Sequence, residues 1–151
     1  MKTKNLIIIF IIISLLVSLC LITYIVIDKN KPLNELDNVT IKIKDGTLTK
    51  AGATISITDL NKIPDEYGEA FRIDIKKKGQ WQELKILNEN TAFNLMAYRV
   101  SKDGTLELEQ NWEYIYGILK KGKYRLVKHV CVKDTACNKK KYFSVEFTIE
   151  E

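Results

Sequence analysis

The chain has few of the residues from which most active sites are built. Its 151 residues include one histidine, three cysteines and two prolines. A Ser-His-Asp or Cys-His catalytic set would have to use His129, which lies in the apolar and basic stretch 127–131 of an expected strand. That setting is typical of a structural or surface histidine, so the sequence predicts a protein that is not an enzyme.

Motifs that hold cofactors are also missing from the sequence. Neither GxGxxG nor GxxxxGK[ST] occurs, which leaves nucleotide binding without support. The domain offers fewer Cys and His ligands than zinc needs, and the acids near Asp59 and Asp65 lack the twelve-residue loop of a calcium site. We therefore expect no cofactor and no metal. His129 and Cys131 lie on one face of a strand, so a Cys–His pair is conceivable unless a disulfide quenches it.

Charge of one sign is not in large excess. The chain carries 24 Lys and Arg residues against 19 Asp and Glu, a formal net charge of +5. Lysines cluster within 76–78, 120–123 and 139–141. We interpret these clusters as solvated turns and strand ends, with contact to anionic lipid or an anionic wall polymer as the alternative. The mild surplus does not predict binding to nucleic acid.

One long apolar run stands near the N-terminus. Lys2 and Lys4 precede the uncharged residues 6–27, and a helix of that length, at about 1.5 Å per residue, would cover a hydrocarbon core of about 30 Å. We predict a cytoplasmic basic tail over residues 1–5, a transmembrane signal anchor over 6–27 and a linker over 28–36.

Two other interpretations of the run stay open. A cleaved signal peptide usually has an apolar stretch of only about 7–15 residues that ends in a small-x-small site, and no such site occurs between Leu16 and Lys31. A lipoprotein signal would use Cys20 as lipid acceptor, but Leu19 is not the small residue expected before it. Because a short basic head is typical of an export signal, we expect a single-pass cell-membrane protein with an extracytoplasmic C-terminal domain.

Beyond the linker, the apolar residues repeat with a period of two. The alternation is clearest over 53–58, 71–76 and 143–149, and Asp-Gly or Lys-Gly pairs break it at turns. Six or seven such strands predict an all-β sandwich. Residues 85–100 have no clean period, and residues 126–132 are apolar at both parities, which indicates a bulge or burial on both faces.

The two cysteines of this region, Cys131 and Cys137, lie on either side of Val-Lys-Asp-Thr-Ala. Their spacing fits a disulfide across a loop between two antiparallel strands in an oxidising compartment. Two reduced cysteines are the alternative.

Two aromatic features suggest specific roles. Tyr124 follows a glycine turn at the start of a late strand, as in the tyrosine corner of immunoglobulin-like sandwiches; a core tyrosine without a special role is the alternative. Trp112, Tyr114 and Tyr116 form the best candidate binding surface, because exposed Trp and Tyr often anchor protein or carbohydrate ligands. Alternatively, Trp112 and Tyr116 close the end of the sandwich while Tyr114 faces out.

These residues also carry a resemblance to a known family. Gly46-Thr47-Leu48-Thr49, Gly52-Ala53-Thr54, Tyr67-Gly68, Trp81 and the run from Trp112 to Arg125 resemble the bacterial immunoglobulin-like domains of exported Gram-positive proteins. The resemblance implies that residues 37–151 form an immunoglobulin-like antiparallel β-sandwich of about seven strands without catalytic activity. The cysteine pair and the lysine-rich loop 138–141 depart from the family pattern.

We therefore expect a membrane-anchored, noncatalytic interaction module whose partner is a protein or a cell-wall polymer. The alternative is a cell-envelope sensor or accessory subunit that acts with a membrane partner, held by the helix or by a lipid on Cys20.

Overall fold

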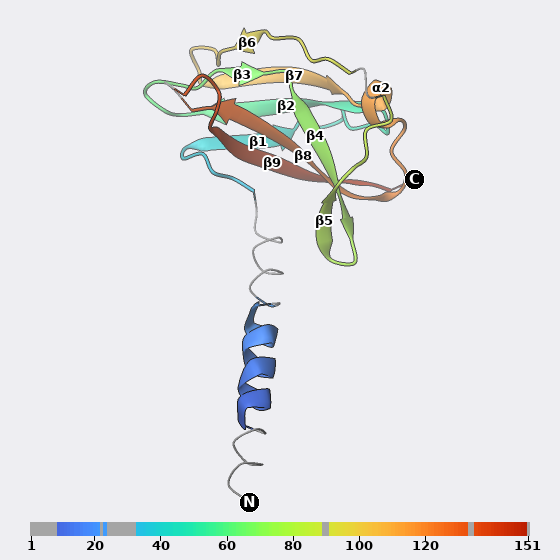
Figure 1. Ribbon diagram of the computed structural model, residues 1–151. Coiled ribbons are helices and arrows are strands. Elements are labelled where there is room, and N and C mark those ends of the chain that lie inside the picture. The colour runs from blue at the N-terminus through green and yellow to red at the C-terminus, as the bar shows by residue number, and fades with distance from the viewer. Residues whose placement is uncertain (1–8, 22, 24–32, 89–90, 133–134, 151) are drawn as a thin grey trace, which may run out of the picture.

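The computed structural model describes residues 9–21, 23, 33–88, 91–132 and 135–150. Residues 9–21 are helical, and in the domain beyond them the regular secondary structure consists of strands apart from one short helix (Figure 1). Over these described ranges, no helix is both long and apolar enough to cross a membrane. The predicted tail over 1–5, and part of the predicted anchor over 6–27, lie outside the described residues.

Two larger antiparallel sheets and one short two-stranded sheet make up the domain. The first has the strand order β1-β2-β7, with β1 at Val39–Ile43, β2 at Gly52–Asp59 and β7 at Thr105–Asn111. The second has the order β5-β4-β8-β9, with β5 at Gln80–Glu83, β4 at Phe71–Lys77, β8 at Gly122–Cys131 and β9 at Lys140–Ile149. A short pair joins β3, Tyr67–Gly68, to β6, Ala97–Tyr98, and the short helix α2 spans Glu113–Tyr116.

The core lies between the two sheets, which pack face to face (Figure 1). Period-two alternation places Ile55 and Ile57 of β2 on the inner face of the first sheet. Ile73 of β4 and Leu126 of β8 occupy the inner face of the second sheet, and all four side chains are fully buried. The all-β sandwich predicted from the sequence is confirmed.

Strand β8 explains why residues 126–132 are apolar at both parities. Its pairing with β9 runs unbroken from Gly122↔Ile149 to Cys131↔Lys140, so the strand contains no bulge. Leu126 is buried in the core, and Val127, which points to the opposite face, is buried as well. Burial on both faces, rather than a bulge, accounts for the pattern.

The outer face of the second sheet carries a buried ionic cluster. Asp74 of β4 accepts hydrogen bonds from Arg125 Nε of β8 at 2.7 Å and from Arg72 Nε at 3.0 Å. The Arg125 guanidinium also lies 4.9 Å from the centre of the Trp81 ring on β5. The cluster therefore ties three neighbouring strands together on the face away from the core.

The chain joins the domain slightly earlier than the predicted linker end at residue 36. Asn34 forms a bridge with Phe143 of β9, and the Glu35 amide donates to the Tyr142 carbonyl at 2.8 Å. Leu36 is buried in the core. Residues 34–36 thus pack on β9, while residues 28–32 of the predicted linker lie outside the described residues.

Candidate functional site

A groove of about 820 Å³ opens at one end of the sandwich. Its walls come from three parts of the chain that are far apart in sequence: residues 63–70, which lead into β4; residues 94–100, which contain β6; and the end of β8 with its following loop. Three large apolar side chains on these walls face solvent: Ile63, 72% exposed, Leu95, 100% exposed, and Met96, 53% exposed. Apolar side chains gathered in this way around a concavity are typical of an interaction site.

Asp59 at the end of β2 holds the first wall in place. Its carboxylate accepts hydrogen bonds from the backbone amides of Asn61 and Asp65, each at 2.9 Å, and from the Tyr67 hydroxyl at 2.8 Å. Burial raises the pKa of this carboxyl, but the hydrogen bonds outweigh burial and leave the pKa below its ordinary value. These three bonds make Asp59 the residue that holds the loop at 61–67 against the end of β2.

Lys128 of β8 is buried and contacts two residues of the first groove wall. The Lys128 ammonium donates to the carbonyls of Glu69 and Ala70 at 3.1 and 3.3 Å, and to Gln110 Oε1 at 3.4 Å. Burial lowers the pKa of Lys128 to about 8, partly opposed by the charge of Glu69. Glu69 also accepts a hydrogen bond from the Tyr98 hydroxyl at 2.5 Å, so this contact links the second wall to the start of β4.

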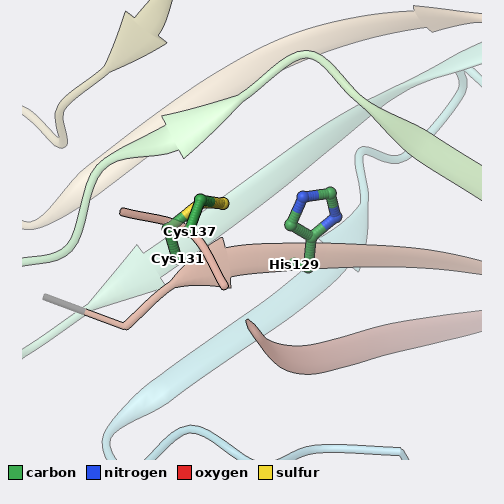
Figure 2. A group of neighbouring side chains, drawn as sticks. All are labelled: His129, Cys131 and Cys137. Carbon is green, nitrogen blue, oxygen red and sulfur yellow. A yellow bond between two sulfur atoms is a disulfide. The ribbon is translucent and has the colours of Figure 1, made fainter. Parts of the chain in front are cut away.

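The end of β8 places the cysteines and the histidine together. Cys131 and Cys137 form a disulfide across the loop between β8 and β9. His129 projects from the same side of β8 as the cysteines (Figure 2), because residues two apart on a strand share a face. Burial and the charges of Lys140, Lys128 and Arg72 lower the pKa of the His129 imidazole.

Of the candidate binding surface at Trp112, Tyr114 and Tyr116, only one side chain is exposed. Trp112 is fully buried, stacks on Phe147 with ring centres 5.2 Å apart and donates to the Lys50 carbonyl at 2.8 Å. Tyr116 is buried too, and only Tyr114, 70% exposed, faces solvent. The short helix α2 is the reason: one turn directs Trp112 and Tyr116 into the core and turns Tyr114 outward.

Tyr124 has the geometry of a tyrosine corner. Its hydroxyl donates to the carbonyl of Lys120, four residues upstream, at 2.8 Å. Gly122 permits this contact, since a Cβ atom there would lie 3.2 Å from the Tyr124 ring. The tyrosine therefore fixes the entry of the chain into β8 and has no place in the groove.

Sequence patterns did not predict the groove residues. Ile63 lies in a turn-like segment, and Leu95 and Met96 lie in the stretch that has no clean period. Their one sequence signal is that they are apolar where no strand or helix would bury them. The His129–Cys131 proximity, in contrast, follows directly from strand spacing.

Comparison with known proteins agrees with this architecture. A family model described as bacterial Ig-like domain matches residues 35–148, which cover most of the chain and all strands of both sheets except the last residue of β9. No curated protein and no solved structure matches the chain. On the strength of the family match and the two-sheet sandwich, the chain belongs to the bacterial Ig-like domain family.

Proposed function

We propose that the protein is a noncatalytic interaction module that an N-terminal anchor holds at the cell membrane, with its Ig-like domain outside the cytoplasm. The family, which is typically noncatalytic, supports the first part of this proposal. The observation that carries it is the groove, whose walls present the exposed side chains Ile63, Leu95 and Met96.

The N-terminal sequence supports the proposed anchor. Residues 6–27 are apolar and uncharged and follow a short basic head, which is how an uncleaved export signal is arranged. The disulfide between Cys131 and Cys137 fits the same location, since disulfides persist in oxidising compartments and are rare in the cytosol.

The chemistry of the groove favours a protein partner over a wall polymer. The large apolar side chains exposed on its walls are aliphatic or thioether groups, and no Phe, Tyr or Trp is among the described residues that line it, whereas carbohydrate sites commonly stack sugars on such rings. Covering one Leu or Ile side chain contributes about 1.5–3 kcal/mol. Two such contacts would supply about 3–6 kcal/mol toward binding an apolar segment of another protein, and the rest of the interface would have to offset the entropic cost of association.

Amine-reactive, membrane-impermeant crosslinking on intact cells tests this function. The groove variant combines Ile63→Asp with Leu95→Asp. The control variant combines Ile118→Asp with Leu60→Asp, which places the same residue types and charges at exposed positions outside the groove. We expect a defined adduct with the wild type and the control, and at least about tenfold less with the groove variant.

Two results would contradict the proposal. Equal adduct yields for the groove and control variants would show that binding does not use the groove. The absence of any adduct in wild-type cells, with the protein present at the surface, would remove the interaction function itself. Near-ultraviolet circular dichroism of each purified variant establishes that it is folded.

A further inference from the structure

We propose that His129, Cys131 and Cys137 bind one Cu(I) ion once an external dithiol has reduced the disulfide. The imidazole nitrogen and the two sulfur atoms all lie within 4.8 Å of one another, and Figure 2 shows them at one end of β8. Metal–ligand bonds of about 2.0–2.3 Å would place the donor atoms around one ion about 3.5–4 Å apart. The cluster therefore needs only side-chain adjustments to enclose a metal. This inference rests on local geometry and does not depend on the partner of the groove.

The loop keeps its cysteines adjacent by contacts other than the disulfide. The Val132 amide donates to the Lys139 carbonyl at 2.9 Å, and the Asn138 amide donates to the Thr135 carbonyl at 2.8 Å. The Thr135 hydroxyl donates to the Val132 carbonyl at 2.6 Å. These bonds close the loop on both sides of Cys137, so the reduced protein retains two neighbouring thiols rather than releasing them.

The number and type of ligands favour Cu(I). Two thiolates and one imidazole are a soft ligand set, and thiolate and thioether ligands select Cu(I) among the common metals. Three ligands complete a trigonal Cu(I) site, whereas a structural zinc site takes four. Met96, another soft ligand, lines the same groove as the three residues.

The charged side chains near the cluster also favour Cu(I) over a divalent ion. Lys140, Lys128 and Arg72 are the cations that act on His129. Three carboxylates lie on the groove walls, those of Asp65, Glu66 and Glu69. Glu66 forms an ion pair with Arg99, and Glu69 accepts the Tyr98 hydroxyl bond. Cu(I) bound to two thiolates and a neutral imidazole carries a net charge of −1, which surrounding cations stabilise. They disfavour the approach of a divalent ion.

Copper binding takes two steps, reduction of the disulfide and then exchange of the thiol protons for the metal. The external dithiol passes two electrons and two protons to the disulfide, which becomes two thiols on Cys131 and Cys137, and the dithiol becomes its own disulfide. Cu(I) then displaces both thiol protons and binds the two sulfur atoms and the His129 nitrogen, without any change in its oxidation state. Cys131 is exposed, so an incoming thiolate can reach its sulfur.

The test uses the detergent-solubilised full chain with Cys20→Ser, which removes the remaining cysteine. The protein is reduced with dithiothreitol, desalted without oxygen and titrated with Cu(I) against bathocuproine disulfonate. We expect one Cu(I) per reduced chain and none per oxidised chain. His129→Gln should weaken binding at least about tenfold, and Cys131→Ser with Cys137→Ser should weaken it further. X-ray absorption of the loaded protein should show two sulfur ligands and one nitrogen ligand.

Four outcomes would each overturn the inference. Reduced and oxidised protein could hold the same amount of copper. Affinity could be unchanged by His129→Gln, or the absorption spectrum could lack a nitrogen ligand, a readout that stands even where that variant does not fold. Finally, equimolar Zn(II) could displace Cu(I) from the reduced protein, which would show that the site prefers a divalent ion.

Discussion

Replacing Lys128 by methionine should change how the stability of the domain depends on pH. The side chain is only 1% exposed, and its ammonium group contacts the carbonyls of Glu69 and Ala70 and the amide of Gln110. Burial lowers its pKa in the folded protein to about 8, from 10.5, because removal from water disfavours the charged form. In the unfolded chain the same group returns to its ordinary pKa.

The sign and size of the effect follow from proton linkage. Between pH 8 and 10.5 the unfolded chain binds a proton that the folded chain does not, so the free energy of unfolding rises with pH. Burying the charged ammonium group lowers the free energy of unfolding by about 3 kcal/mol. This loss is fully present at a pH below the pKa of the folded protein and is absent above the pKa of the unfolded chain. From about pH 7.5 to about pH 9.5, the wild type should gain about 2 kcal/mol relative to Lys128→Met.

Urea unfolding followed by tryptophan fluorescence measures this difference, since Trp81 and Trp112 are both buried. Cys20→Ser in every variant prevents thiol–disulfide exchange at high pH. Lys121→Met, which removes an exposed lysine, is the matched control and should keep the pH dependence of the wild type. Parallel stability curves for the wild type and Lys128→Met would refute the reasoning.

Three further substitutions test contacts that hold the domain together, each by urea unfolding. Asp59→Asn should lower the free energy of unfolding by about 2–3 kcal/mol at neutral pH, because three donors converge on the carboxylate. Because the pKa of Asp59 is lowered in the folded protein, this difference between wild type and variant should shrink as the pH falls below 3.8. Tyr124→Phe should cost about 1 kcal/mol through its lost hydroxyl bond, and no measurable cost would contradict the corner. Asp74→Ala should cost about 3–5 kcal/mol, because it leaves Arg125 buried without its partner; an additional Arg125→Met should recover part of that loss.

The sheets were predictable because period-two alternation reflects burial on one face. In β2, Ala53, Ile55 and Ile57 are buried, while the threonines and serine between them are half-exposed. The turn at Lys78-Gly79 was also predictable from the sequence. Both residues have positive φ, 49° and 79°, as a two-residue hairpin between β4 and β5 requires.

The remaining features depend on tertiary contacts that no local pattern encodes. Helix α2 was not predicted from the sequence, because it depends on the buried Trp112, which docks against the backbone of residues 50 and 51. Leu95 stands fully exposed in a stretch without periodicity, and it is part of a groove only because residues from 63–70 line the same concavity. The sequence argument against zinc counted ligands for a tetrahedral ion and did not consider that His129, Cys131 and Cys137 would bring their ligand atoms within 4.8 Å of one another.

The most direct test of the proposed location is labelling of intact cells with a membrane-impermeant maleimide, before and after an impermeant reductant. An anchored extracytoplasmic domain with Cys131 and Cys137 in a disulfide should be labelled only after reduction. The label should be lost in the variant that carries Cys131→Ser and Cys137→Ser. Labelling that requires cell lysis, with or without reductant, would place the domain in the cytoplasm and contradict the account.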